Sequence, residues 1–280
     1  MNKEIKFAFQ GVNGAYSELA GNNIFNNSVS IPNNTFEEMF ESVRNNKADV
    51  ALVPIENSRA GRVADTQRLI PESNLKIIGE YFLEVNHCLL VLPGTSLIEI
   101  KRIHSHEQAI TQCRQNIIKI NKNMIIAADT AGAAKMVSEK KNKEDAAIAS
   151  SLAAHTYQLD ILVKNFQDVQ NNVTRFLIMA KDLALPDLNE PSLMTTLVFE
   201  LKSIPAALYK ALGGLASNGV NMTKLESYIN PKGFDVAQFY MDIEGHPDNI
   251  NVKLALEEMK YFCKHIDILG VYKMSDFRKK

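Results

Sequence analysis

Several features that would indicate other classes of protein are missing from this sequence. Only three of its 280 residues are cysteines, Cys88, Cys113 and Cys263, which are widely spaced and form no Cys-x-x-Cys pair. The sequence therefore indicates neither a disulfide framework nor a cysteine-rich metal site. The six histidines include no His-Glu-x-x-His arrangement, and His104 and His106 do not specify a metal without further ligands. We expect reduced thiols and no metal.

The chain also lacks an excess of charge of either sign and any long apolar run. Its formal net charge is -1, with 46% apolar and 22% charged residues, the profile of an ordinary globular protein. The sequence has no basic stripe that would indicate a nucleic-acid partner. It also has no stretch of about 18 apolar residues that would indicate a membrane span, and its first residues do not resemble a signal peptide. We therefore expect a cytoplasmic protein that binds neither nucleic acid nor membrane.

Apolar runs of strand length alternate with helical patterns through the first two-thirds of the chain, which favours an α/β fold with largely parallel sheets. Thr35 and Glu38 form a capping box that predicts the start of a helix, and Thr130 is expected to cap the small-residue helix that follows it. The expected strands are Ile5 to Phe9, Asp49 to Val53, Val85 to Leu92, Arg102 to Ser105, Met124 to Ala128, Ala146 to Ala149 and Arg175 to Met179.

A second unit is predicted after a linker at residues 183–192, a polar, acidic decapeptide that contains two prolines. The pattern then reads as a strand at 195–201, a helix with Pro205 in its first turn, two strands, a second helix and a last strand at 266–272. The order is βαββαβ, the split ferredoxin-like arrangement. This arrangement does not by itself fix a function.

Five polar segments follow strands of the first unit, and each has a structural explanation when it is taken alone. They would serve as a glycine turn, a helix cap, an N-cap at Ser105, a tightly packed helix start and a turn into a strand. Together they lie at the edge where open α/β sheets bind ligands. The segments are residues 10–17, 54–61, 105–108, 129–135 and 171–176.

These segments occur in an order that resembles the motif series of prephenate dehydratases. An ordered series is much more specific than any single motif. The stretch from Asn218 to Ser227 is similar to the ACT regulatory domain of the same family. The matching segments are Gly11-x-x-Gly14-Ala15-Tyr16-Ser17, Pro54-Ile55-Glu56-Asn57-Ser58, Ser105-His106-x-Gln108 with Gln112-Cys113, Asp129-Thr130-Ala131-Gly132-Ala133-Ala134, Ile148-Ala149-Ser150 and Asn172-x-Thr174-Arg175-Phe176.

The resemblance implies a catalytic domain at residues 1–182 with two α/β lobes, like a type II periplasmic binding protein. One lobe would comprise residues 1–80 and about 174–182, and the other residues 81–173. An α+β, ferredoxin-like ACT domain would follow at 193–280. The activity implied is the loss of water and carbon dioxide from prephenate to give phenylpyruvate, without a cofactor.

The resemblance also implies roles for individual residues. Thr174 would act at the leaving hydroxyl as a positioned donor, and Arg175 would hold a carboxylate. Glu56 has two open roles: a proton source if burial raises its pKa, or a structural acceptor of backbone N–H groups. The substrate-binding residues that we expect are Asn57, Ser58, Ser105, His106, Gln108, Thr130, Ala131, Asn172, Arg175 and Phe176.

For the ACT-like unit the resemblance implies L-phenylalanine as effector and a homodimer or homotetramer. The family's Glu-Ser-Arg-Pro stretch reads Glu226-Ser227-Tyr228-Ile229 here, and its Gly-Ala-Leu-x stretch reads Ala206-Ala207-Leu208-Tyr209, so the identity of the ligand is less secure than the domain. The expected regulatory residues are Asn218, Gly219, Val220, Asn221, Leu225, Glu226 and Ser227.

Three alternatives remain open from the sequence. The substrate of an arogenate dehydratase has an amino group where prephenate has a ketone, and nothing readable in the sequence excludes that activity. A two-lobed amino-acid sensor would share the cleft without doing chemistry. The ACT-like unit could serve dimerisation alone, since a fold does not determine a function.

Overall fold

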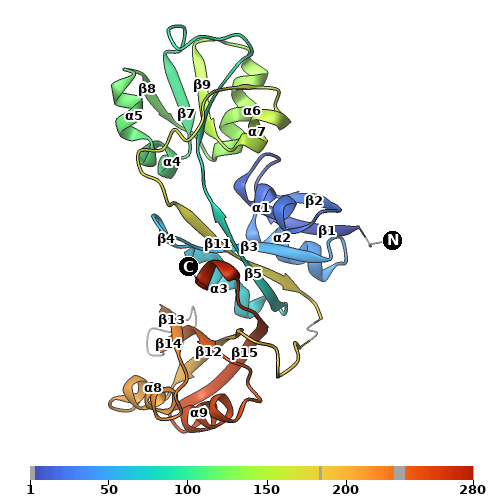
Figure 1. Cartoon of the computed structure of the whole chain (residues 1–280), viewed down its shortest axis with the longest axis vertical. Helices are drawn as coiled ribbons and strands as arrows, with labels where there is room; N and C mark the ends of the chain where they lie inside the picture. The colour runs from blue at the N-terminus through green and yellow to red at the C-terminus, as the bar shows by residue number, and fades with distance from the viewer. Residues whose placement is uncertain (1–3, 183–184, 230–236, 280) are drawn as a thin grey trace. The chain divides into compact units, whose positions relative to one another are not determined.

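The computed structural model describes residues 4–182, 185–229 and 237–279, so the first two residues of the expected linker lie outside the description. The chain forms two compact units (Figure 1). Unit 1 contains Met1–Val63 and Phe82–Phe176, and unit 2 contains Ala64–Tyr81 and Leu177–Lys280. Among the described residues, no helix has both the length and the apolar character needed to cross a membrane.

The first sheet of unit 1 is parallel at its centre. Strand β1 (Ile5–Gln10) pairs in parallel with β2 (Ser28–Asn33) and with β3 (Val50–Asn57), and β3 is followed in the sheet by β11 (Val173–Ala180). Helices α1 (Tyr16–Ile24) and α2 (Phe36–Arg44) make the connections. The short strand β4 (Gly61–Arg62) pairs with the end of β3. This arrangement brings the end of β3 beside the start of β11, although more than a hundred residues separate them in sequence.

The second sheet of unit 1 has the order β10-β6-β9-β7-β8. Its strands are β6 (Cys88–Val91), β7 (Arg102–Ser105), β8 (Asn123–Ile126), β9 (Asp145–Ala149) and β10 (Asp160–Val163). The pairs of β7 with β8 and β9 are parallel, whereas those of β6 with β9 and β10 are antiparallel. The connecting helices are α4 (Glu107–Gln112), α5 (Arg114–Lys119), α6 (Thr130–Lys140) and α7 (Ser151–Thr156).

Both faces of this second sheet are covered, which explains its unbroken apolar strands. Along β6, Leu89 and Val91 enter one apolar cluster, while Cys88 and Leu90 enter the cluster on the opposite face. The same alternation continues along β9. Successive strand residues point to opposite faces, so a strand buried on both sides must be apolar at every position.

Unit 2 contains α3 (Ala64–Glu72), part of β5 (Lys76–Glu84) and the C-terminal elements. These elements are β12 (Leu193–Leu201), α8 (Ala207–Ser217), β13 (Met222–Ile229), β14 (Ala237–Glu244), α9 (Ile250–Lys260), β15 (Cys263–Lys273) and the 3-10 turn η1 (Asp276–Lys279). The strand order is β13-β14-β12-β15-β5. Helices α8 and α9 lie side by side on one face of this sheet, where the apolar core of the unit is located (Figure 1).

Strands β15 and β5 approach very closely at Gly270, which pairs in parallel with Ile77. A Cβ atom at position 270 would lie 2.1 Å from the Ile77 carbonyl oxygen, so only glycine permits this pairing. On the C-terminal side, Arg278 binds the fully buried carboxylate of Glu80 through Nε–Oε1 and NH2–Oε2 contacts of 2.7 and 3.0 Å. The C-terminal turn is thereby fixed to β5.

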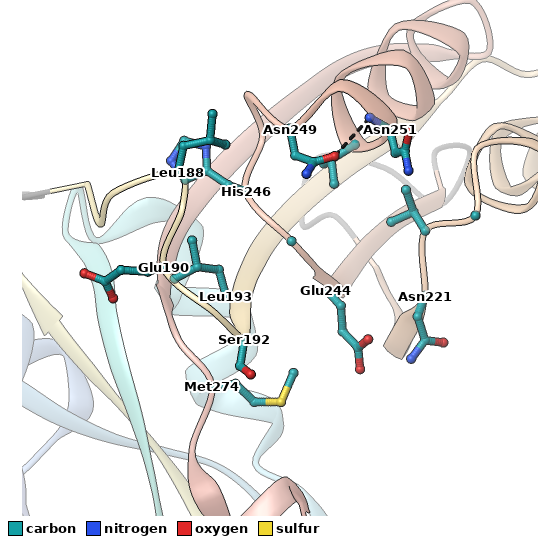
Figure 2. Close-up of a pocket in the computed structure, with 14 residues that line it drawn as sticks. Leu188, Glu190, Ser192, Leu193, Asn221, Glu244, His246, Asn249, Asn251 and Met274 are labelled. Carbon is teal, nitrogen blue, oxygen red and sulfur yellow. Dashed lines mark hydrogen bonds between the residues drawn. The ribbon is translucent and has the colours of Figure 1, made fainter.

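A cavity of about 390 Å³ opens in unit 2 at the turn after α8 (Figure 2). Its wall combines two carboxylates, Glu190 and Glu244, with the amides of Asn221, Asn249 and Asn251. The remaining wall is contributed by Leu188, Ser192, Leu193, Gly219, Val220, Gly245, His246, Val252 and Met274.

Several expectations about secondary structure need correction. Strands β2, β4, β5 and β10 were not predicted, and the antiparallel pairs of the second sheet were not foreseen.

Pro205 does not lie in the first turn of a helix, because α8 begins at Ala207 after Ala206, whose φ is +58°. Ser105 does not cap α4: the cap is His106, whose side chain accepts from the Gln108 N–H. Likewise Asp129, not Thr130, caps α6.

Candidate functional site

The loop after β3 is held against the start of β11 by backbone and hydroxyl contacts. The Ser58 N–H donates to the Val173 carbonyl at 2.8 Å, and the Val173 N–H donates to Ser58 Oγ at 2.9 Å. Ser58 Oγ in turn donates to the Asn171 carbonyl at 3.2 Å. Side chains at the end of β3 therefore have a fixed position relative to those at the start of β11.

Asn57, the last residue of β3, uses every polar atom of its side chain. Its Oδ1 accepts from the N–H groups of Arg59 and Ala60 at 2.9 and 2.8 Å. Because the oxygen is fixed in this way, Nδ2 points the other way and donates to Asn172 Oδ1 at 2.7 Å and to Thr174 Oγ1 at 2.9 Å. The orientation of the amide is set by the backbone of its own turn.

This contact determines what the Thr174 hydroxyl can do. Since its oxygen accepts a hydrogen bond from Asn57, its own hydrogen is directed elsewhere and is available to a bound ligand. The neighbouring Asn172 is buried, and its Nδ2 donates to Gln112 Oε1 at 2.7 Å. A cavity of about 190 Å³ lies beside this group, lined by Arg59, Thr111, Gln112, Gln115, Asp168, Val169 and Asn172.

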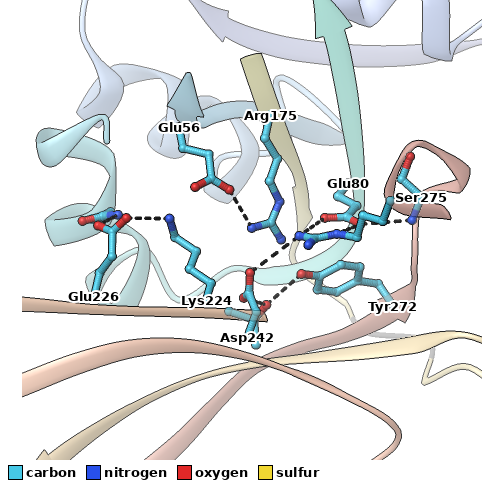
Figure 3. A network of polar contacts seen from close by, with 11 residues as sticks. Glu56, Glu80, Arg175, Lys224, Glu226, Asp242, Tyr272 and Ser275 are labelled. Carbon is cyan, nitrogen blue, oxygen red and sulfur yellow. Dashed lines mark hydrogen bonds and ion pairs between the residues drawn. The ribbon is translucent and has the colours of Figure 1, made fainter. Parts of the chain in front are cut away.

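Glu56 and Arg175 form an ion pair that is separate from this cluster. Arg175 NH1 donates to Glu56 Oε1 at 3.1 Å, and the side chains are 1% and 34% exposed (Figure 3). Glu56 precedes Asn57 on β3, and Arg175 follows Thr174 on β11. Since consecutive strand residues point to opposite faces, the ion pair lies on one face of the two strands and the Asn57–Thr174 contact on the other.

Other predicted site residues have structural surroundings instead. The Ser105 hydroxyl is fully buried and donates to the Ile148 carbonyl at 2.6 Å. Ala131 and Phe176 are buried, at 0% and 1% exposure. The glycine turn before α1 holds a carboxylate of its own helix, because Glu18 Oε2 accepts from the Gly14 N–H at 2.6 Å. The structure thus gathers Asn57, Ser58, Asn172 and Thr174 into one group.

Gln112 was missed as a site residue, although it belongs to the hydrogen-bonded cluster. The signal was available, because Gln112 stands in the resembling motif series beside Cys113. No group of three or more His, Cys, Asp or Glu side chains that would hold a metal ion occurs within the described part of the chain.

The expected regulatory residues divide between different surroundings in unit 2. Gly219, Val220 and Asn221 line the cavity of Figure 2. The Asn218 side chain donates to Glu258 Oε1 at 2.9 Å, which joins the end of α8 to α9. On β13, Leu225 packs against the apolar core and Glu226 accepts from Lys224 and from Gln67 of α3.

The fold is α/β, with a C-terminal unit in which two helices cover one face of antiparallel strands. The family model described as prephenate dehydratase matches residues 7–184. The chain belongs to the prephenate dehydratase family and is an enzyme of that family.

Three relatives illustrate the range of the family. The chain is 46% identical over 280 residues to the "Bifunctional N-acyl-homoserine lactone acylase/prephenate dehydratase" of Komagataeibacter europaeus, with 100% of both chains covered. It is 38% identical to "Arogenate dehydratase/prephenate dehydratase 1, chloroplastic" of Arabidopsis thaliana, covering 98% of this chain and 73% of the relative. The crystal structure of prephenate dehydratase in complex with L-Phe from Arthrobacter aurescens is similar with a TM-score of 0.88 and 31% identity, covering 97% of this chain and 91% of that one.

Proposed function

We propose that this enzyme converts prephenate to phenylpyruvate and that Thr174 acts at the hydroxyl that leaves. The observation that carries the proposal is the 2.9 Å hydrogen bond from Asn57 Nδ2 to Thr174 Oγ1, which leaves the threonine hydrogen free to donate. Similarity to relatives named for prephenate or arogenate dehydration supports the choice of substrate class. Loss of carbon dioxide and hydroxide makes the ring aromatic, so the protein's tasks are orientation, donation to the leaving oxygen and desolvation.

In this proposal the C4–oxygen bond and the ring–carboxylate bond of prephenate break together. The electron pair of the carboxylate bond enters the ring, carbon dioxide departs, and the leaving oxygen receives a proton to become water. A threonine hydroxyl is a weak acid, so Thr174 stabilises the leaving oxygen as a positioned donor or relays a proton, and is not a sufficient acid by itself.

The ion pair between Glu56 and Arg175 favours a structural role for Glu56 over the role of proton source. A carboxylate paired with a buried guanidinium is stabilised in its charged form and is therefore a poor proton source. We propose that the pair holds β3 beside β11 from the face opposite Thr174. Recognition of the substrate would then depend on the Asn172 and Gln112 amides and the Ser58 turn, with the starts of α4 and α6, near His106, Gln108, Thr130 and Ala131, as further proposed contacts.

Turnover of prephenate and arogenate by the purified chain tests this function directly. We expect phenylpyruvate from prephenate without added metal or nucleotide, and undiminished activity after chelation. If the enzyme turned over arogenate alone, its substrate would be arogenate and not prephenate. If folded protein gave no product from either compound, the proposed function would be refuted. The fractions should be free of other dehydratases, so fractions purified in parallel from cells that do not express this chain should show no turnover.

We also propose that residues 193–280 form an ACT domain that binds L-phenylalanine and regulates the enzyme. The element order β12-α8-β13-β14-α9-β15 and the strand order β13-β14-β12-β15 support a ferredoxin-like arrangement. The cavity at Gly219 and Asn221 supports a ligand with an ammonium group, because Glu190 and Glu244 line it. A cytoplasmic homodimer or homotetramer belongs to the same proposal.

A second activity deserves a direct test because of the Komagataeibacter relative, which is named an acylase as well as a dehydratase. Hydrolysis of an N-acyl-homoserine lactone would release a fatty acid and homoserine lactone. Thr174 is a poor nucleophile for that reaction, since its neighbour Asn57 is an amide and cannot act as a base. Chromatography of an acyl-homoserine lactone incubated with the enzyme would decide, and persistence of the activity in Thr174→Ala would assign it to another site.

A further inference from the structure

The hydrogen-bonded cluster around Thr174 continues beyond Gln112 to two residues that the mechanism has not used, His87 and Tyr16. His87 Nε2 lies 3.0 Å from Gln112 Oε1, and His87 Nδ1 lies 2.7 Å from the Tyr16 hydroxyl. The two rings meet edge to face with centroids 5.5 Å apart. A continuous chain of side chains therefore joins the start of α1 to Thr174.

The backbone of His87 is fixed, so its ring has little freedom to leave this chain. Its N–H donates to Gln167 Oε1 at 2.9 Å, and its carbonyl accepts from the Phe166 N–H at 2.7 Å. The residue is 3% exposed. The segment that carries it leads from β5 to β6 and is held by the loop between β10 and β11, which contains Phe166 and Gln167.

The direction of every hydrogen bond in the chain follows from its Asn57 end. Because the Asn57 oxygen is occupied by backbone N–H groups, its nitrogen must face the Asn172 oxygen. The Asn172 nitrogen then faces the Gln112 oxygen. That oxygen is an acceptor, so His87 must carry its proton on Nε2. His87 Nδ1 then carries a lone pair and accepts from the Tyr16 hydroxyl at 2.7 Å, a shorter contact than the 3.2 Å from the same hydroxyl to the Asn86 carbonyl.

The protonation states of His87 and Tyr16 agree with this direction. Burial lowers the pKa of His87, only partly offset by the hydrogen bond to Gln112, so the ring is neutral and has one proton to place. Burial raises the pKa of Tyr16 well above its ordinary value, so the phenol keeps the proton that it donates. Gln112 Nε2 has no acceptor among the described residues, which leaves its two donors for a ligand.

We infer that His87 and Tyr16 are positioning residues of the dehydratase reaction. They hold Gln112 and Asn172 in the one orientation that matches the Asn57 turn, which fixes the position from which Asn57 Nδ2 donates to Thr174 Oγ1. The inference rests on the proposed function. It assigns no contact with substrate to either ring. Their effect passes through the amides, so it should appear in kcat more than in KM.

A double-mutant cycle between Tyr16→Phe and Thr174→Ala tests the inference. Tyr16→Phe keeps the ring and its contact with His87 but removes the hydroxyl, which donates to His87 Nδ1 and also lies 3.2 Å from the Asn86 carbonyl. We expect kcat for prephenate to fall roughly three- to tenfold in the wild-type background, as for loss of one hydrogen bond, with KM within about twofold. In Thr174→Ala the same change should alter the residual rate less than about twofold, because no hydroxyl remains to be oriented.

Equal factors in the two backgrounds would mean a purely structural role and would overturn the inference, as would an unchanged kcat in Tyr16→Phe. Tyr157→Phe is the matched control, since it removes a tyrosine hydrogen bond of 2.6 Å to the Asn13 carbonyl in the same unit, and its kcat should stay within about twofold of wild type. His87→Leu should lose kcat, and His87→Gln, which restores a donor toward Gln112, should recover most of it.

A measurement without turnover separates this inference from the proposed function. Nitrogen-15 NMR of histidine-labelled protein should show His87 protonated at Nε2 and unprotonated at Nδ1, and the signal should be assigned with His87→Gln. A proton on Nδ1 would contradict the inferred direction even if prephenate is turned over. If wild-type protein made no phenylpyruvate, the proposed function would fail while the NMR result still decided the direction of the chain.

Discussion

The side-chain nitrogen of Asn57 donates to Thr174 Oγ1 at 2.9 Å, while the Asn57 oxygen is occupied by two backbone N–H groups of its own turn. The pair joins the end of β3 to the start of β11. Because the amide cannot turn round without losing its turn, the threonine oxygen is kept as an acceptor and its hydrogen as a donor. The catalytic proposal depends on this relationship.

Asn57→Asp should remove the donor and preserve the shape. The new carboxylate still accepts from the Arg59 and Ala60 N–H groups, but it would take the Thr174 hydrogen for itself. We expect kcat for prephenate to fall about 100-fold or more, in the range for loss of acid–base assistance. Steady-state kinetics measure this, with exposed Asn45→Asp as the control for the added charge. An Asn57→Asp enzyme with wild-type kcat would show that the amide does not direct Thr174.

Glu56→Gln should affect folding more than catalysis. The substitution removes the charge that faces the buried Arg175, and because Glu56 is one-third exposed we expect the unfolding free energy to fall by about 1–3 kcal/mol. The value of kcat below the melting transition should stay within about threefold of wild type. Urea denaturation measures the unfolding free energy and prephenate turnover measures kcat, with Glu72→Gln at an exposed position as the control. A folded Glu56→Gln protein with a more than hundredfold lower kcat would instead make Glu56 the proton source.

The buried His87 should make stability depend on pH. Its pKa is lowered in the folded protein from the ordinary 6.5, so the unfolded chain binds a proton that the folded chain does not as pH falls below 6.5. Its contribution to stability is therefore fully present above that pH and is lost below it, with a slope of at most about 1.4 kcal/mol per pH unit. Urea unfolding of wild type and His87→Gln between about pH 8 and about pH 5 should show the wild-type advantage shrinking in acid. If the unfolding free energies of the two proteins changed in parallel with pH, the lowered pKa of His87 would be contradicted.

Much of the local structure could be predicted from sequence because its signals are local. Thr35 caps α2 as expected, with the Glu38 N–H donating to Thr35 Oγ1 at 3.1 Å, whereas the Glu38 carboxylate accepts from the Asn34 N–H at 2.9 Å, one residue before the cap. The strand expected at Arg102 to Ser105 has those bounds. Strand β5, by contrast, carries charges and a glycine and lies in the sheet between β15 and β11, whose residues are about a hundred or more positions away in the sequence. No short window contains that information.

In the candidate site, too, local motifs could be predicted from the sequence, whereas contacts between distant segments could not. Asn57, Asn172 and Thr174 were expected from their motifs, and the structure brings them together. The motif could not show that Thr174 and Arg175 point to opposite faces with different partners, since that depends on which side chains β3 presents. The part played by His87 and Tyr16 follows only from hydrogen bonds between segments about seventy residues apart in sequence.

L-Phenylalanine should bind unit 2 with a measurable heat. Calorimetry with phenylalanine, tyrosine and tryptophan would rank the ligands, and Gly219→Val should weaken binding because position 219 has φ +65° at the edge of the cavity. Glu244→Gln tests the same cavity without backbone strain. By linkage, phenylalanine that weakens substrate binding must itself bind more weakly when a prephenate analogue is present. No heat from any of the three would leave the unit a role in assembly alone.

The turnover of prephenate by Thr174→Ala, Thr174→Ser and wild type tests the central claim most directly. If the hydroxyl acts only as the leaving group departs, kcat of Thr174→Ala should fall about 100-fold or more with little change in KM, and Thr174→Ser should recover a large part of it. Circular dichroism and the melting temperature of all three proteins should agree, because Thr174 is only half-buried. A Thr174→Ala enzyme that keeps the wild-type kcat would contradict the account and remove Thr174 from the mechanism.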